Sequence, residues 1–328
     1  MSELKKYQLN LAEIEKSGQS KATREGYGDA LPALGDKFPK IVALDADLAG
    51  STQSAKFGKK FPTRFFNMGI AESNMAGVSA GLAAAGYIPF FSTFAVFAVE
   101  RAFEAIRQSI AYPCQNVKIC ASHGGVTVGE DGGSHQSIED ISLMRSLPNM
   151  SVFVPADYTE VCMGLNTFAE RKGPMYMRMG RAKFPVLFGE DYPFEYGKWT
   201  ELTEGRDIAI IACGVETYQT LKAAEELKSQ GVSARVINAS WVKPIDAKML
   251  EDCSLNCKAI LTCEEHSIIG GLGSAVAEFL AERGGPKLMR VGMKDRFGSS
   301  GDAYELLDKF ELSAPFIAKA ARELLERS

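Results

Sequence analysis

The chain has 328 residues, of which 46% are hydrophobic and 24% charged, and its formal net charge is −4. This composition is typical of a soluble protein with about two domains, and the charge gives no general affinity for nucleic acid or an anionic membrane. No apolar run reaches the ~18 residues of a membrane span, and the polar N-terminus lacks the apolar centre of a signal peptide. Seven cysteines without a CxxC pair favour reduced thiols over a disulfide framework or a zinc site.

The first half of the chain alternates short apolar runs with stretches that have a helical pattern. Strands that are buried on both faces are continuous apolar runs, and their alternation with helices predicts a parallel, doubly wound α/β sheet. The predicted strands are KIVALDADL, YIPFFSTF, NVKICASHGG, SVFVPAD and GPMYMRMG, and the predicted helices cover residues 71–85, 97–111, 138–146 and 157–171.

The pattern breaks between residues 181 and 198, where proline, glycine and aromatic residues follow one another with no clear period. Such a composition is typical of a crossing between domains. A second α/β set follows, with strands predicted for DIAIIACG, SARVINASWV, KAILTCEEH and KLMRVGM. We therefore predict an N-terminal arm over residues 1–20, one α/β domain over residues 21–188 and a second over residues 189–328.

The segment SHGGVTVGEDGGSHQS, residues 122–137, holds two of the three histidines, His123 and His135, and the acidic pair Glu130 and Asp131. It follows a predicted strand, and ligand sites of parallel sheets are built from loops at the carboxyl ends of strands. Its glycines would let the backbone approach a ligand closely. A plain surface turn explains the glycines but not the histidines and carboxylates together, so we predict a functional site here.

Other candidate residues have an ordinary structural explanation beside a functional one. Glu72 begins a predicted helix, where an acid favours the helix dipole. Phe94 and Phe97 are three residues apart, a spacing more typical of core packing than of a stacked planar ligand. Three residues near predicted strand–loop edges could together bind a phosphate. They are Arg24, Ser51 and Arg178.

Taken together, these segments resemble the thiamine-diphosphate-dependent transketolase family. The most specific element is GEDGGSHQ, which is similar to the family's GEDGPTHQ. The upstream GIAE is shared more widely, with deoxyxylulose-phosphate synthase and the β subunits of 2-oxo acid dehydrogenases. The resemblance covers the C-terminal half of a full transketolase. It implies a pyrimidine-binding domain over residues 21–188 and a transketolase C-terminal domain over residues 189–328.

The resemblance implies cofactor contacts for four residues. Glu72 matches the glutamate that hydrogen-bonds N1′ of the aminopyrimidine of thiamine diphosphate, a bond that favours the imino tautomer needed to deprotonate the thiazolium. Phe94 and Phe97 match aromatic residues around the pyrimidine. Asp47 matches an aspartate near the thiamine.

The resemblance also implies that residues 122–137, hereafter the histidine loop, recognise the sugar. Asp131 is expected to bind a hydroxyl of the donor, and His123 to line the same channel. A phosphate clamp is expected from His135, Arg24, Ser51 and Arg178.

An expected motif is missing from the chain. The family binds Mg2+ and the diphosphate through a GDG motif in its N-terminal half, and this sequence has no GDG. A hard cation needs several oxygen ligands, so we predict no metal ligand here and a separate N-terminal transketolase subunit that holds both groups. We expect a cytoplasmic α2β2 assembly, with homodimeric contacts between copies of this chain, that is inactive without that partner.

The predicted reaction is the transfer of a two-carbon ketol unit from a ketose phosphate to an aldose phosphate. One alternative is the β subunit of a 2-oxo acid dehydrogenase or an enzyme similar to deoxyxylulose-phosphate synthase. The histidine loop with Arg24 and Arg178 favours sugar phosphates over that alternative. A second alternative is a non-catalytic assembly subunit. The presence of Glu72, Asp131 and His135 in one chain argues against it.

Overall fold

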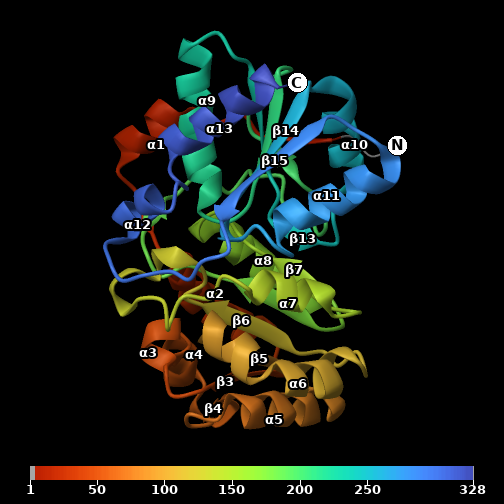
Figure 1. Cartoon of the computed structure of the whole chain (residues 1–328). Helices are drawn as coiled ribbons and strands as arrows, with labels where there is room; N and C mark the ends of the chain where they lie inside the picture. The colour runs from red at the N-terminus through yellow and green to blue at the C-terminus, as the bar shows by residue number, and fades with distance from the viewer. Residues whose placement is uncertain (1–3, 328) are drawn as a thin grey trace.

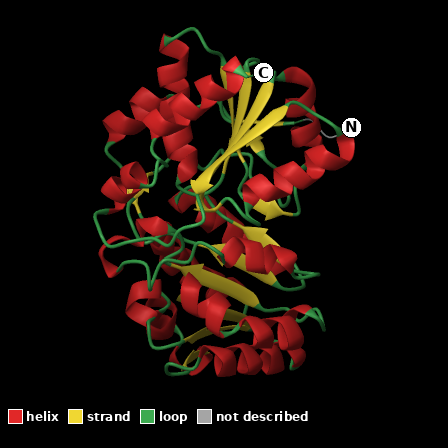
Figure 2. Ribbon diagram, in the orientation of Figure 1, coloured by secondary structure: helices red, strands yellow, loops and turns green. Residues whose placement is uncertain are grey.

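The computed structural model describes residues 4–327, which form two α/β units, one above the other in Figure 1. In each unit, helices lie on both faces of a central sheet (Figure 2). The predicted strands and their alternation with helices are present, which confirms the doubly wound α/β class.

The first unit is built on a seven-stranded sheet in the order β13-β7-β8-β6-β5-β3-β4. Its strands pair in parallel, except that β13 is antiparallel to β7. The parallel strands therefore end at one common edge. They are β3 (Ile41–Asp45), β4 (Phe65–Asn67), β5 (Ile88–Phe94), β6 (Lys118–Ser122), β7 (Ser151–Phe153) and β8 (Met175–Arg178).

Helices cover both faces of this sheet because its strands are apolar on both sides. On one face, α2 (Thr23–Lys37) and α8 (Tyr158–Glu170) bury Tyr27 and Phe168. The opposite face is covered by α5 (Glu72–Ala84), α7 (Asp140–Ser146) and the helical stretch 97–111. Two short helices, α3 (Ala49–Thr52) and α4 (Ala55–Lys60), follow β3.

The stretch 97–111 is predicted as one regular helix, but it has an irregular winding. Two wide π-helical segments, Phe97–Arg101 and Ile106–Ala111, flank the short α6 (Phe103–Ala105). Such π turns are rare and occur frequently at functional sites.

The second unit has a six-stranded sheet in the order β1-β10-β12-β11-β14-β15. Helices α9 and α13 pack on one face, and α10 and α11 on the other. The strands are β1 (Lys5–Lys6), β10 (Thr200–Glu201), β11 (Ile208–Ala212), β12 (Ala234–Asn238), β14 (Ala259–Ser267) and β15 (Lys287–Met293). The helices are α9 (Glu216–Ser229), α10 (Ala247–Asn256), α11 (Leu272–Arg283), α12 (Ala303–Lys309) and α13 (Ala314–Glu326).

Each unit is completed by a strand from a distant part of the chain. The N-terminal arm contributes β1, which pairs with β10, and its helix α1 (Leu11–Ser17) follows. In the other direction, β13 (Trp241–Lys243) leaves the second half of the chain and joins the first sheet beside β7. The buried Trp241 ring stacks on Phe153 at a centroid distance of 4.5 Å.

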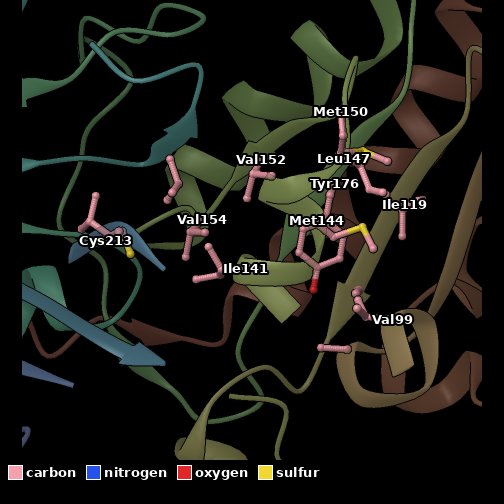
Figure 3. Close-up of a cluster of buried hydrophobic side chains, with 14 of the residues drawn as sticks. Val99, Ile119, Ile141, Met144, Leu147, Met150, Val152, Val154, Tyr176 and Cys213 are labelled. Carbon is pink, nitrogen blue, oxygen red and sulfur yellow. The ribbon is translucent and has the colours of Figure 1, made fainter. Parts of the chain in front are cut away.

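The apolar core also continues from one unit into the other. Figure 3 shows Ile119 and Tyr176 of the first sheet, Ile141 of α7 and, further along, Cys213 of the second unit in the same buried cluster. Buried apolar area of this kind is the main favourable contribution to folding. A continuous core therefore fixes the two units relative to each other.

The crossing between the units is held by the buried carboxylate of Asp157. Its Oδ1 accepts from the Glu160 N–H at 2.8 Å, which caps α8, and its Oδ2 accepts from Leu187 N–H at 2.8 Å and Phe188 N–H at 2.9 Å. Burial raises the pKa of Asp157 to about 6.

Replacing Asp157 with alanine should lower the free energy of unfolding by about 3 kcal/mol, because a helix cap is lost and two buried N–H groups are left unpaired. Thermal or denaturant unfolding measures this loss. Glu170→Ala is the matched control, since it removes only an exposed ion pair with Lys37. Equal stability of the two variants would contradict the assignment.

Candidate active site

The histidine loop begins where β6 ends, at the common edge of the first sheet. Ser122, the last residue of β6, pairs with Phe94, the last residue of β5. His123 follows with φ 61°, a left-handed backbone conformation that turns the chain sharply. The His123 ring stacks on Phe94 with centroids 3.6 Å apart and is 2% exposed.

Phe94 and Phe97 form the centre of a ring cluster that also contains His123 and His135. Their rings are nearly parallel, with centroids 5.8 Å apart. His135, at the other end of the histidine loop, meets both rings edge-on, at 6.3 Å from Phe94 and 5.5 Å from Phe97. The structure thus brings together two aromatic and two histidine residues that the sequence places in separate segments.

Glu72 lies beside this cluster as the first residue of α5. Its side chain is buried, and its Oε1 pairs with Nη1 of Arg101 at 3.3 Å. The same guanidinium lies over the Phe97 ring, 4.5 Å from its centroid. Glu72 therefore faces the space over the Phe97 ring, and the exposed Arg101 side chain occupies that space.

A neighbouring loop is shaped by the buried carboxylate of Asp45, which accepts from Leu48 N–H and from the hydroxyls of Thr52 and Ser54 at 2.6–2.8 Å. This turn leaves Asp47 exposed at φ 66°.

The same loop brings two predicted residues to the site edge. Asp47 Oδ1 accepts from Nδ2 of Asn67 at 3.0 Å. The carbonyl of Ser51 accepts from Nη1 of Arg24 at 2.8 Å, which ties Arg24 to this loop.

The imidazole of His123 is neutral. Burial, together with the charges of Arg24, Arg181 and His135, lowers its pKa to about 3. Nη1 of Arg24 lies 3.4 Å from Nε2, and a guanidinium can only donate, so Nε2 is the acceptor. The proton is then on Nδ1, which lies 2.8 Å from the Ser122 hydroxyl.

One of the basic residues predicted for the phosphate clamp lies inside the protein. Arg178 is buried: its Nε pairs with Asp140 Oδ2 at 3.1 Å, and its Nη2 donates to the carbonyls of Ser137 and Glu265. The structure therefore uses the Arg178 guanidinium inside the protein and does not bring it to the cluster.

Arg181, three residues further on, is instead near enough for its charge to act on His123 and Arg24. Its Nη1 donates to the carbonyl of Val128 at 2.8 Å and to Oε2 of Glu130 at 2.6 Å. The pKa of Arg24 is lowered first by burial and then by the charge of Arg181, and the carboxylates of Glu25 and Asp131 oppose this shift. Arg24, Arg181 and the exposed Asp131 are thus near enough to interact electrostatically. Arg181 lies in the loop just past the carboxyl end of β8, and ligand sites of parallel sheets are built from such loops, so its position along the chain is a signal for a site residue.

Within residues 4–327 no group of three or more His, Cys, Asp or Glu side chains is placed to hold a metal ion. The same part of the chain has no helix that is long and apolar enough to cross a bilayer.

The sequence matches the family model of the transketolase pyrimidine-binding domain over residues 19–186 and that of the transketolase C-terminal domain over residues 197–317. The chain belongs to the transketolase family. A Methanocaldococcus jannaschii protein with the provisional name "transketolase C-terminal section" is 48% identical over 96% of this chain and 99% of its own.

Further relatives show how much of a transketolase the chain represents. Human transketolase is 35% identical over 95% of this chain but only 50% of its own length. A 6-deoxy-6-sulfo-D-fructose transketolase subunit of a Clostridium species is 41% identical over 93% of this chain and 94% of its own. A solved structure described as a split gene transketolase, inactive beta4 tetramer, superimposes with a TM-score of 0.87 at 50% identity, and covers 93% of this chain and 98% of that one.

Measuring the histidine protons tests the electrostatics of the transketolase-like site. Burial lowers the pKa of His266 to about 4 as well as that of His123 to about 3. The imidazole NMR resonances of these two residues should therefore not move between pH 8 and pH 5. Both folded pKa values lie below the unfolded value of about 6.5, so these two side chains bind more protons in the unfolded chain below pH 6.5, and their contribution to stability falls as the pH drops toward 4. Titration of His123 near pH 6.5 would contradict this account.

Proposed function

We propose that this chain is the pyrimidine-side subunit of a split transketolase, which transfers a two-carbon ketol unit from a ketose phosphate to an aldose phosphate. The observation that carries the proposal is the buried carboxylate of Glu72 next to the ring of Phe97, with Phe94, His123 and His135 in the same cluster.

The residues around Phe97 fit the aminopyrimidine of thiamine diphosphate. A planar group with N–H donors, the Arg101 guanidinium, already lies over the Phe97 face and reaches Glu72 Oε1. An aminopyrimidine is also planar and carries nitrogen donors, so it can make the same pair of contacts once Arg101 moves away. Arg101 is 53% exposed, so water screens its side of the pair with the buried Glu72, and the guanidinium has open solvent to move into.

When bound, thiamine diphosphate supplies the nucleophilic carbon and the electron sink that the transfer of a ketol unit requires. The role of this chain would be to surround it. The Glu72 carboxylate would hydrogen-bond the pyrimidine nitrogen, and Phe94 and Phe97 would pack around the ring and exclude water. Asp47 lies at the neighbouring loop edge, where it can contact the rest of the thiamine.

Sugar recognition is assigned to the opposite side of the cluster. Arg24 and Arg181 supply positive charge near His135 and Ser51, which suits the tetrahedral anion at the end of a sugar phosphate. Asp131 is exposed beside them and can accept hydrogen bonds from sugar hydroxyls. The neutral His123 can contact the substrate without adding a charge. The similarity to a 6-deoxy-6-sulfofructose transketolase subunit makes a sulfonated sugar a second substrate class for the same clamp.

A second chain is proposed because this one corresponds to half of human transketolase. That N-terminal subunit would hold Mg2+ and the diphosphate, and we propose an α2β2 assembly. The inactive β4 tetramer of the split-gene relative supports a requirement for the partner.

The proposal is tested by mixing this chain with the separate N-terminal transketolase subunit of the same organism, called the N-terminal section below. Ketol transfer from a ketose phosphate to an aldose phosphate is then measured. The mixture should be active and each chain alone inactive. Glu72→Gln should lower kcat of the mixture by a factor of about 10² or more, because an amide cannot exchange a proton with the pyrimidine nitrogen as a carboxylate can. Glu282→Gln, at an exposed carboxylate on α11, is the control and should leave kcat unchanged. Full activity of this chain alone, or of the Glu72→Gln mixture, would refute the proposal.

The clamp assignment makes a separate prediction. Arg181→Met or His135→Ala should raise KM for a phosphorylated ketose by roughly 10-fold or more, the loss expected for a hydrogen bond to a charged group. KM for an unphosphorylated ketose should stay the same, because the anion is absent. Lys287→Met, at an exposed position of β15, controls for the loss of a positive charge. An unchanged KM for the phosphorylated sugar in both site variants would exclude the clamp.

A further inference from the structure

Glycines of the histidine loop lie against the second α/β unit, where a side chain would collide. A Cβ atom on Gly125 would come within 2.2 Å of the Glu265 carboxyl carbon, and one on Gly132 within 2.4 Å of the Ser300 hydroxyl. A Cβ on Gly133 would lie 2.9 Å from the carbonyl oxygen of Gly298. Glycine is needed at these positions because another part of the protein approaches the backbone.

Hydrogen bonds join the same two surfaces. The buried carboxylate of Glu265 accepts from Thr127 N–H at 3.0 Å and from the Thr127 hydroxyl at 3.1 Å. Gln136 Nε2 donates to the carbonyl of Val126 at 2.9 Å and to the carbonyl of Ser299 at 3.0 Å. Both ends of the loop are thus bonded to residues that follow β13 in the sequence.

The loop has little regular structure of its own to fix its shape. Its centre is a short 3-10 segment, Val126–Asp131, that is interrupted at Gly129, where φ is 85°. Gly125 and Gly132 on either side also have positive φ, at 79° and 77°. A flexible glycine-rich chain loses much conformational entropy when it is ordered, and outside contacts must offset that loss.

We propose that the second α/β unit fixes the conformation of the histidine loop. Glu265 and residues 298–301 are positioning elements, which hold Asp131 and His135 where they meet the substrate. This inference rests on the proposed ketol transfer for its consequence in substrate binding. No residue of the second unit needs to touch the reacting atoms. The unit acts by restricting the loop to one conformation before the sugar arrives, which lowers the cost of binding.

The adjacent residue Glu264 provides a matched control. It lies on the same strand, is equally buried, and also accepts two hydrogen bonds, from Leu272 N–H at 2.7 Å and Gly273 N–H at 2.8 Å. These bonds cap α11 inside the second unit and do not reach the histidine loop. Loss of Glu264 should destabilise the second unit without releasing the loop directly.

Two measurements on Glu265→Ala and Glu264→Ala test the inference. Amide hydrogen exchange of the full chain should show that Glu265→Ala speeds exchange in residues 124–137 by about 10-fold or more, whereas Glu264→Ala does so mainly at the start of α11. In the mixture with the N-terminal section, Glu265→Ala should raise KM for the ketose phosphate at least about 5-fold with little change in kcat, and Glu264→Ala should not. Glu265→Gln, which keeps an acceptor for Thr127 N–H, should restore most of the affinity.

A second variant guards against failure of Glu265→Ala to fold. Gly298→Ala would place a Cβ against Oε1 of Gln136 and should loosen the same loop from the other side of the contact. Wild-type exchange in residues 124–137, or an unchanged KM, in both Glu265→Ala and Gly298→Ala would overturn the inference. If the wild-type mixture showed no ketol transfer, the proposed function would fail, and the exchange measurement would still decide whether the second unit holds the loop.

Discussion

One buried guanidinium, that of Arg178, joins the three parts of the molecule on which the candidate active site depends. It ends β8, pairs with Asp140 of α7, and donates to the carbonyls of Ser137 in the histidine loop and Glu265 in the second unit. A buried charge is stable only when it is paired and hydrogen-bonded. The first sheet, the loop and the second unit therefore have to assemble together around this side chain.

The site built on that junction separates its charges by function. The positive groups, Arg24 and Arg181, lie at the side that we assign to the sugar, and the low pKa of His123 keeps that ring neutral between them and Phe94. The carboxylate of Glu72 lies beyond Phe97. Aromatic rings thus stand between the group assigned to the cofactor and the groups assigned to the anion, and the site can bind an anionic sugar without neutralising Glu72.

Local patterns in the sequence predict what depends on nearby residues. The apolar runs locate the strands, and their carboxyl ends locate the histidine loop, because burial and strand direction follow from composition and order. Features that depend on distant partners could not be predicted. The strand containing Trp241 pairs with β7, which lies far earlier in the chain. Arg178 is buried because its guanidinium contacts α7 and the second unit, and this leaves Arg181 as the arginine at the site. Likewise, the glycines of the histidine loop predict a close approach of the backbone to a ligand, whereas several of them allow the second unit to approach the backbone.

Glu72 and the aromatic cluster are proposed to form half of a cofactor site that another chain completes. The most direct test is calorimetric titration of thiamine diphosphate, in the presence of Mg2+, into this chain, into the N-terminal section and into their mixture. We expect saturable binding by the mixture only, and a roughly 10-fold or greater loss of affinity in the Glu72→Gln mixture, because a hydrogen bond to a charged group is lost. Equal affinity of this chain alone and of the mixture, or an unchanged affinity in the Glu72→Gln mixture, would contradict this proposal.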